Sequence, residues 1–372
     1  MDFTVSEEQV ELGGLARKIL AERDAPWGDL AAAGVLAAGL PASLDGAGLG
    51  LLEQCSVLVE IGRSVSDVPY LTSVVVGAGA VAEFGTAVQR SQWARPAGRG
   101  SVVLTAALES EDLATAVRSG SGSWVVSGVK TAVPFAPQAD VFLVPCASAE
   151  GVLVFLVSPS DAGVTVEAQA LTSFASAGRL VLDAVALGDD RVLGAGSDVA
   201  GWLVARGTVG LCAMQVGVLE RALELTAEHA RTRVQFGRPI GAFQAVAQRL
   251  ADAYIDVEAV RLTMWQAAWL LASGGSGPEL DAAVATAKFW AADAGHRVAH
   301  TAVHVHGGLG IDMSYPVHRY FVAAKGNEFA LGGATAQLRR IGAVLAEVGL
   351  PVTHLGRTIT SADVRRLEDD DW

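Results

Sequence analysis

The feature that most constrains the fold is a change of pattern that occurs twice along the chain. Apolar residues first recur with helical spacing, and short β-branched segments separated by Gly, Ser, Asp or Pro begin near Gly100. Helical spacing returns at Asp198 and continues to about Glu347. Strands that follow one another directly pair with one another rather than alternating with helices. The sequence therefore predicts an α+β fold with an N-terminal helical domain, a middle antiparallel β domain and a C-terminal four-helix bundle.

The domain boundaries follow from the same change of pattern. We expect the helical domain in residues 1–98, the β domain, a barrel or sandwich, in 99–195, and the bundle in 196–350, with a polar tail over 351–372. The four bundle helices are expected in residues 199–230, 242–272 and 279–304 and after Gly333.

Local signals indicate individual elements. Ser6 and Gln9 form a capping box that begins a helix running to about Arg23, and Pro69–Phe84 is a further apolar helix. In the β region, SVVLTAAL, SWVVSGVK, DVFLVPC and GVLVFLVSP have the composition of strands, and Arg179–Gly194 is expected to close the sheet.

Charge and composition exclude several classes of protein. A net charge of −13 argues against a nucleic-acid or anionic-membrane surface. No uninterrupted apolar run is long enough to span a bilayer, and the acidic start MDFTVSEEQV lacks the form of a signal peptide. Three widely spaced cysteines do not predict a disulfide framework. We expect a soluble, cytoplasmic protein.

One segment, Arg231–Leu262, has an unusual combination of residues. Two arginines and a Phe-Gly pair precede a Pro-bearing turn, and a long helix follows. An apolar stripe on this helix is expected to face a core, through Phe243, Val246, Ala247, Leu250, Tyr254, Val257 and Met264. A helix entry that carries arginines offers free N–H groups and positive charge to a diphosphate. Taken alone, it favours an ordinary bundle helix whose basic start is solvated.

The segment resembles the acyl-CoA dehydrogenase family, in which TRxxFGxxIxxFQ marks a helix whose arginine and glutamine hold the ADP half of FAD. That FAD belongs to the neighbouring subunit. The resemblance implies FAD as cofactor, with Arg233, Phe236 and Gln244 as contacts. A later segment, VHVHGGLGIDMSYPVHRYF, resembles the family's VQxxGGxGxxxxxPVxRxxR. It adds His304, in place of the glutamine, and Gly308.

The same family implies a reaction and a catalytic base. A glutamate removes the α proton of an acyl-CoA while the flavin takes a hydride from the β carbon. The position that matches this glutamate is Leu331, and the alternative position on the first bundle helix is Gly207. Neither side chain accepts a proton, so no catalytic residue is expected at the usual places. Glu328 and Asp252 are nearby acids to which a base could have relocated.

The flavin-ring side also departs from the family. Its TEPxAGSD signature matches Thr105–Asp112, which keeps the threonine but lacks the Pro and the Gly-Ser turn. The resemblance therefore implies that this chain keeps the residues that hold a neighbour's FAD and lacks those of its own flavin pocket. A partner subunit that carries the pocket and the glutamate would complete the enzyme.

Such an arrangement resembles the non-base subunit of actinobacterial heteromeric acyl-CoA dehydrogenases of sterol side chains, which form α2β2 tetramers. The resemblance covers about residues 1–347. It implies a CoA-thioesterified steroid substrate, as in cholesterol side-chain degradation, and an electron-transfer flavoprotein as acceptor.

Two alternatives stay open at this level. The chain could be a self-sufficient flavoenzyme with a relocated base. It could also be a scaffold without activity, or a metal-binding protein, because His296, His300 and His304 follow one another at four-residue steps on one helix face. No Asp or Glu lies between His296 and His306 to complete a metal site of the HExxH type, so no metal is expected.

Overall fold

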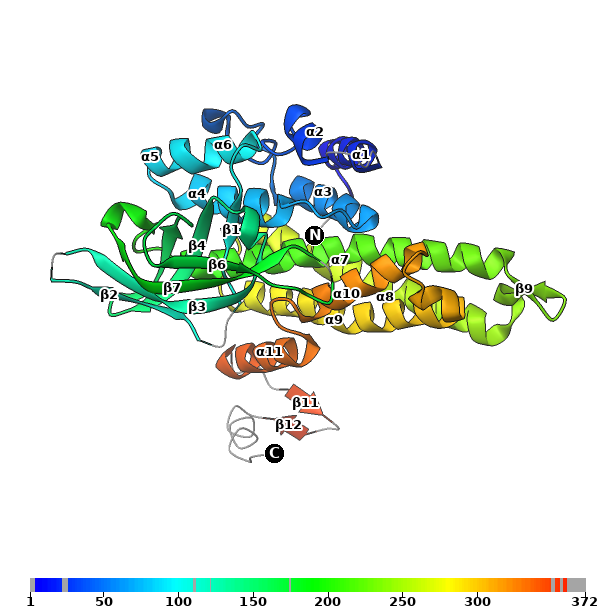
Figure 1. Cartoon of the computed structure of the whole chain (residues 1–372). Helices are drawn as coiled ribbons and strands as arrows, with labels where there is room; N and C mark the ends of the chain where they lie inside the picture. Colours follow the sequence, from blue (N-terminus) through cyan, green and yellow to red (C-terminus); the bar gives the residue numbers. More distant parts are fainter. Residues whose placement is uncertain are drawn as a thin grey trace.

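The computed structural model describes residues 4–21, 26–109, 112–120, 122–173, 175–348, 352–354 and 357–359. The order of its elements confirms the predicted fold class, with N-terminal helices, a central β-sheet domain and a C-terminal helical domain. In Figure 1 the N-terminal helices lie along one side of the long bundle, and the sheet lies at one end of it.

The N-terminal region begins as the sequence predicts. Its helices are α1 (Glu7–Ala21), α2 (Pro26–Ala32), α3 (Leu51–Ser64), η2 (Tyr70–Ala78), α4 (Gly79–Phe84), α5 (Ala87–Gln89) and α6 (Arg95–Gly98). The Ser6 N–H donates to Gln9 Oε1 at 2.8 Å and the Gln9 N–H donates to Ser6 Oγ at 3.2 Å, which confirms the capping box. The expected helix end near Arg23 lies outside the described residues.

The sheet is mainly antiparallel, as predicted. Its strands are β1 (Leu104–Ala106), β2 (Ala114–Arg118), β3 (Trp124–Pro134), β4 (Val141–Ser148), β5 (Gly151–Val157), β6 (Val164–Ala168), β7 (Ala177–Leu187) and β8 (Val192–Leu193). The strands are ordered β6-β7-β3-β2-β4-β5-β8. Both β1 and β2 pair with β4 in parallel, because β3 runs back along β2 and the next turn reverses the chain again. The strand expected to close the sheet is divided: β7 lies inside it, and β8 forms one edge.

The C-terminal domain contains one helix more than the sequence predicts. Its helices are α7 (Val199–Thr232), α8 (Gln244–Ala272), α9 (Pro278–His306), α10 (Pro316–Phe329) and α11 (Ala334–Val348). The unpredicted helix is α10, which begins with Pro at its first position. In the segment expected to be a loose tail, β11 (Val352–His354) and β12 (Arg357–Ile359) pair as antiparallel strands.

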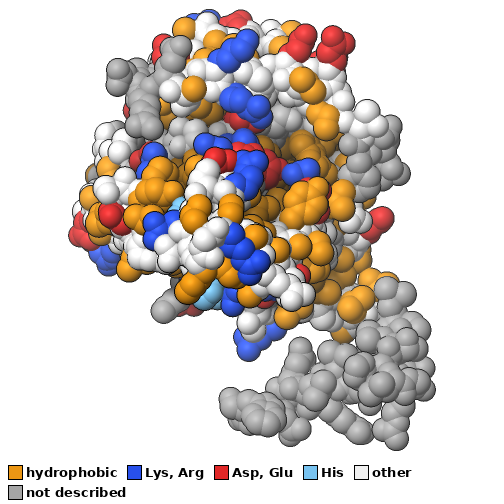
Figure 2. Space-filling model, turned by 90° about the vertical axis from the view of Figure 1, so that its right-hand side faces the viewer, with side chains coloured by type: hydrophobic (Ala, Val, Ile, Leu, Met, Phe, Trp, Pro, Cys, Tyr) orange, Lys and Arg blue, Asp and Glu red, His pale blue; other side chains and the backbone are white. Residues whose placement is uncertain are grey.

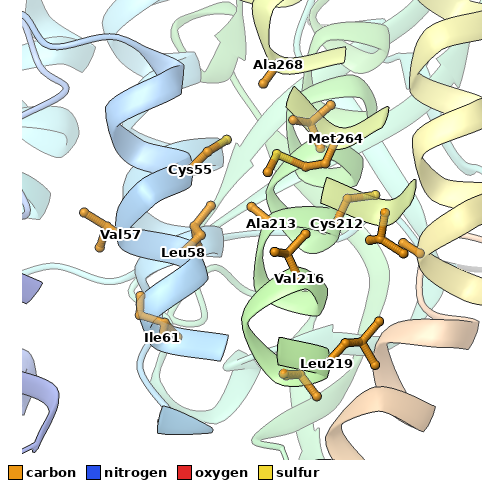
Figure 3. Packing of buried hydrophobic residues seen from close by; sticks show 14 of the residues in the cluster. Cys55, Val57, Leu58, Ile61, Cys212, Ala213, Val216, Leu219, Met264 and Ala268 are labelled. Carbon is orange, nitrogen blue, oxygen red and sulfur yellow. The ribbon is translucent and has the colours of Figure 1, made fainter. Parts of the chain in front are cut away.

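The central helix of the molecule is α7. By length and composition alone it could cross a membrane, but 72% of its most apolar window is buried inside the protein, as in the core helix of a soluble domain. Figure 3 shows α7 packed between α3 and α8, with Leu58 and Val216 pointing toward the shared core. A Cβ added at Gly217 would lie 1.9 Å from Val59 O, so glycine is required where α3 and α7 approach most closely.

The three cysteines are free and buried in the core. Burial raises the pKa of the Cys55, Cys146 and Cys212 thiols to about 12, so they are neutral packing groups rather than nucleophiles.

The apolar stripe expected on α8 is only partly correct. Val257 and Met264 are buried, but Tyr254 is 60% exposed. The buried face instead includes Ala253, Val260, Ala267 and Ala268. The outer face of α8 is left uncovered by the described residues.

Candidate active site

Three segments meet at the end of the bundle opposite the sheet: the end of α7, the start of α8 and the end of α9. Between α7 and α8, β9 (Val234–Gln235) and β10 (Arg238–Pro239) form a hairpin that projects from the bundle (Figure 1). At its tip Phe236 has φ +51° and is 92% exposed. The ring of Phe236 therefore lies almost wholly in solvent at the tip of the hairpin.

Arg233 is fixed by its backbone at the end of α7. Its N–H donates to His229 O at 2.9 Å, and its carbonyl accepts the N–H of Ile240 at 2.8 Å. The neighbouring Arg231 forms an ion pair with Glu228. In the part of the chain that the structure describes, no carboxylate pairs with Arg233, so its charge is available to an anion.

The other residues that the sequence assigned to the cofactor lie on the same end. Gln244 begins α8, His304 lies in the last turn of α9, and Gly308 lies in the 3₁₀ helix η7 (Gly307–Ile311). All three are exposed. No atom lies within 4 Å of a Cβ added at Gly308, so a ligand backbone can approach closely there.

His306, which sequence reasoning did not assign to the cofactor, joins these segments. Its ring stacks on His229 of α7 with centroids 4.4 Å apart, and its Nδ1 lies 2.8 Å from Ala302 O. Its Nε2 is buried and has no partner among the described residues. Burial lowers the pKa of His306, so the ring is held in its neutral form. Its position directly before the Gly-Gly pair was the available sequence signal.

The surface of this end is both apolar and basic. Figure 2, which views it from outside the bundle, shows hydrophobic side chains interspersed with Lys and Arg. The exposed apolar residues include Ile311, at 69%, and Met313, at 72%. The guanidinium of Arg238 lies over the ring of Phe243, 4.2 Å from its centroid.

The two positions matched to the family's base lie close to each other. A Cβ added at Gly207 of α7 would lie 3.5 Å from Leu331 Cδ1, 3.7 Å from Leu108 Cδ1 and 3.8 Å from Val76 Cγ2. These are ordinary van der Waals distances. The N-terminal helices, the sheet and the bundle therefore meet in one apolar contact at this point.

The loop around Leu331 is restrained by polar groups that sequence reasoning missed. Leu331 has φ +57°, and its N–H donates to Glu109 Oε1 at 2.5 Å. The buried Gln337 donates through Nε2 to Leu331 O at 3.0 Å and to Gly332 O at 3.1 Å. Only the spatial arrangement reveals the contact with Glu109, because Glu109 and Leu331 are 222 residues apart.

The acids considered as relocated bases point elsewhere. Glu328 is bound by Lys325 at 2.5 Å and by His296 at 3.2 Å, as expected for a structural ion pair. Asp252 lies on the exposed face of α8. The ring centroids of His296 and His300 are 4.3 Å apart. Within the described residues no group of three or more His, Cys, Asp or Glu side chains could hold a metal ion.

Comparison with known proteins identifies the family. A profile described as "Acyl-CoA dehydrogenase, N-terminal domain" matches residues 8–101, and one described as "Acyl-CoA dehydrogenase, C-terminal domain" matches residues 194–346. Acyl-CoA dehydrogenase FadE27 of Mycobacterium tuberculosis is 49% identical over 371 residues, covering 93% of this chain and 99% of that protein. This chain belongs to the acyl-CoA dehydrogenase family. Its cofactor is FAD, as in acyl-CoA dehydrogenases.

Solved structures agree with this acyl-CoA dehydrogenase over nearly its whole length. A chain of the ChsE4–ChsE5 complex from Mycobacterium tuberculosis has a TM-score of 0.88 at 49% identity, covering 93% of this chain and 99% of that chain. A variant of the Tcur3481–Tcur3483 steroid acyl-CoA dehydrogenase has a TM-score of 0.86 at 40% identity, covering the same shares. Butyryl-CoA dehydrogenase from Megasphaera elsdenii, 23% identical with a TM-score of 0.84, shares the fold.

The residues of this acyl-CoA dehydrogenase can be tested against the chemistry of FAD. At the end of the bundle that carries Arg233, Gln244, His304 and Gly308, hereafter the cofactor end, three groups are available to a ligand. Among the described residues, the Arg233 guanidinium has no carboxylate partner and the buried His306 Nε2 has no hydrogen-bond partner, and the backbone at Gly308 is open. These groups suit a diphosphate and an adenosine. Leu331 and Gly207, in contrast, offer no carboxylate.

Proposed function

We propose that this chain is one subunit of a heteromeric, FAD-dependent acyl-CoA dehydrogenase. The enzyme would introduce an α,β double bond into a CoA-thioesterified steroid side chain. The observation that carries the proposal is the pairing of Gly207 with Leu331, where both alternative positions of the base lack a carboxylate. The catalytic glutamate would then come from a second acyl-CoA dehydrogenase subunit, in an α2β2 assembly.

The division of labour follows from the chemistry of each end of the bundle. Arg233, Phe236, Gln244, His304 and Gly308 would hold the ADP half of an FAD whose flavin lies in the partner. When bound, FAD accepts a hydride from the β carbon of the acyl thioester. The charge of Arg233 would hold the diphosphate in place, and the partner's glutamate would remove the α proton.

The exposed apolar residues around the cofactor end support contact with a partner. Phe236, Ile311 and Met313 are strongly exposed, and Figure 2 shows hydrophobic side chains interspersed with Lys and Arg on this end. Exposed apolar surface rimmed by polar groups is typical of an interaction site. A subunit docked there would remove these side chains from water and bring its own flavin pocket against Arg233.

The relatives support the heteromer and the substrate class. One solved relative is the ChsE4–ChsE5 complex, and another is described as a steroid acyl-CoA dehydrogenase made of Tcur3481 and Tcur3483. On its composition we place this chain in the cytoplasm, and the family resemblance implies an electron-transfer flavoprotein as its electron acceptor. In this proposal the helical domain spans residues 1–98, the β domain 99–195 and the bundle 196–350.

Turnover by the assembled enzyme tests the proposal. The chain is co-expressed with a candidate partner that carries the family's glutamate, and the purified complex is assayed with an artificial electron acceptor. Steroid side-chain CoA thioesters are compared with straight-chain acyl-CoAs. We expect turnover of the steroid thioester by the complex and none by this chain alone. Loss of turnover on changing the partner's glutamate to glutamine is the matched control. Full turnover by this chain alone would contradict the proposal.

A further inference from the structure

Leu331 is a leucine in a left-handed conformation. Its φ is +57°, a conformation that glycine adopts readily, Asn and Asp adopt occasionally and a leucine rarely adopts, because its Cβ then lies too close to the following carbonyl oxygen. A conformation of this kind persists only where its surroundings determine it from several directions. Hydrogen bonds to the loop of residues 330–333 from two sides hold Leu331 in this conformation.

The contact from the sheet side is Glu109. Its carboxylate accepts the Leu331 N–H at 2.5 Å, and its own backbone is anchored because its carbonyl accepts the N–H of Thr131 in β3 at 3.2 Å. The preceding residue, Leu108, lies in the apolar contact at Gly207. Glu109 therefore binds the backbone of Leu331, and the adjacent Leu108 contributes to the apolar contact around the Leu331 side chain.

The contacts from the bundle side are Gln337 and Lys288. Gln337 is fully buried and donates to both Leu331 O and Gly332 O. Lys288 of α9, also fully buried, donates through Nζ to Asn327 O and Glu328 O, each at 3.0 Å. These carbonyls end α10, so Lys288 caps the helix from which the loop emerges.

The Lys288 ammonium and the Glu109 carboxylate lie on the two sides of the same loop. Burial lowers the pKa of Lys288, and the nearby Glu109 and Glu328 carboxylates oppose that shift. Lys288 therefore binds the last carbonyls of α10, and Glu109 binds the N–H of Leu331 in the loop that follows.

We propose that Glu109 is a positioning residue that latches the sheet to the 330–333 loop and so closes this subunit's own base position. The latch holds Leu331 against Gly207 and Val76, which fills with apolar side chains the space where a base would act. This proposal rests on the proposed function, since only a subunit that relies on its partner's site can have its own closed.

Hydrogen exchange of the Leu331 amide in the purified complex tests the latch. In the wild-type complex we expect this amide to be protected, although it lies outside any helix or strand. Glu109→Ala removes the acceptor, and we expect exchange of the 330–333 amides to become about tenfold faster or more, as for loss of a hydrogen bond to a charged group. Glu109→Gln keeps an acceptor oxygen, and we expect it to retain most of the protection.

Three results would overturn the latch. The first is free exchange of the Leu331 amide in the wild-type complex. This measurement remains informative even if the variants fail to fold. Another is unchanged exchange in Glu109→Ala, and the third is a Glu109→Gln variant as fast as Glu109→Ala. FAD content of the same wild-type sample separates the two proposals. Two FAD per pair of unlike chains would contradict the proposed function, whereas one FAD with a freely exchanging amide would contradict only the latch.

Discussion

Gly207 and Leu331 face each other, and a Cβ at Gly207 would contact the Leu331 side chain at 3.5 Å. The two residues are far apart in sequence, on α7 and in the loop between α10 and α11. By the family resemblance, these are the two positions at which a base would be expected. We propose that apolar packing stands there in place of a carboxylate, so that neither position supplies a base in this chain.

Replacement of Arg233 tests the assignment of the cofactor end. In Arg233→Ala, FAD retention by the complex should weaken by about 10- to 100-fold, because a charge-assisted contact of about 1.5–3 kcal/mol is lost. Retention is measured by dilution and visible absorbance. Arg231→Ala is the matched control, since Arg231 is already neutralised by Glu228. Equal FAD loss in both variants would contradict a specific role for Arg233.

A carboxylate placed at the lost base position should not restore activity. In Leu331→Glu the new charge would lie among Leu108 and Val76 and beside Glu109, and we expect destabilisation of about 2 kcal/mol and no turnover by the chain alone. Leu331→Met is the control for altered packing. Thermal unfolding and an acceptor assay provide the readouts, and turnover by the isolated variant would refute the account.

Replacement of two glycines of α7 by alanine should change the stability of the protein in opposite directions. Gly207→Ala should stabilise the protein by about 0.5–1 kcal/mol, because the added Cβ meets only ordinary contacts and a helix interior favours alanine. Gly217→Ala should destabilise it strongly, because its Cβ would lie 1.9 Å from Val59 O of α3. Denaturant unfolding of each complex measures both. A stabilised Gly217→Ala would show that the approach of α3 and α7 is not tight.

The stacked pair of His229 and His306 predicts an acid-sensitive stability. Burial lowers the pKa of both rings in the folded state below the ordinary value of 6.5, so the unfolded chain takes up protons first as the pH falls. The contribution of the pair is complete above about pH 6.5 and is lost as the pH falls through the folded pKa values. In His306→Phe, which keeps a ring, the drop in Tm between pH 7.5 and 5.5 should be smaller. His304→Phe on the exposed face is the control, and an equal drop in wild type and His306→Phe would exclude the effect.

Much of the fold could be predicted because its signals are local. The Ser6–Gln9 capping box, the β-branched strands and the long apolar period of α7 depend on neighbours in sequence. The helix α10 was missed because its segment mixes small and polar residues, and its C-terminus is stabilised by Lys288 of another helix. The orientation of Tyr254 was misjudged because the buried face of α8 includes Ala253, Ala267 and Ala268 beside its larger residues, and alanines give a weak periodic signal.

The candidate site was predictable where a motif carries it. Arg233, Phe236 and Gln244 lie within one segment, and the fold brings His304 and Gly308 to the same end of the bundle. The polar groups around Leu331 could not be predicted in this way. The contact of Glu109 with Leu331 depends on how the sheet meets the bundle, and no local pattern encodes that meeting. Gln337 lies only six residues from Leu331, but the sequence gives no sign that its side chain turns back to the loop.

Whether the FAD site is shared between unlike subunits is decided by the flavin content, from visible absorbance, of this chain purified alone and of its complex with the partner. We expect no flavin on the chain alone and one FAD per pair of unlike chains in the complex, with loss of that FAD in Arg233→Ala. A full load of flavin on the chain alone would contradict a shared site, because the chain's own pocket would then be intact.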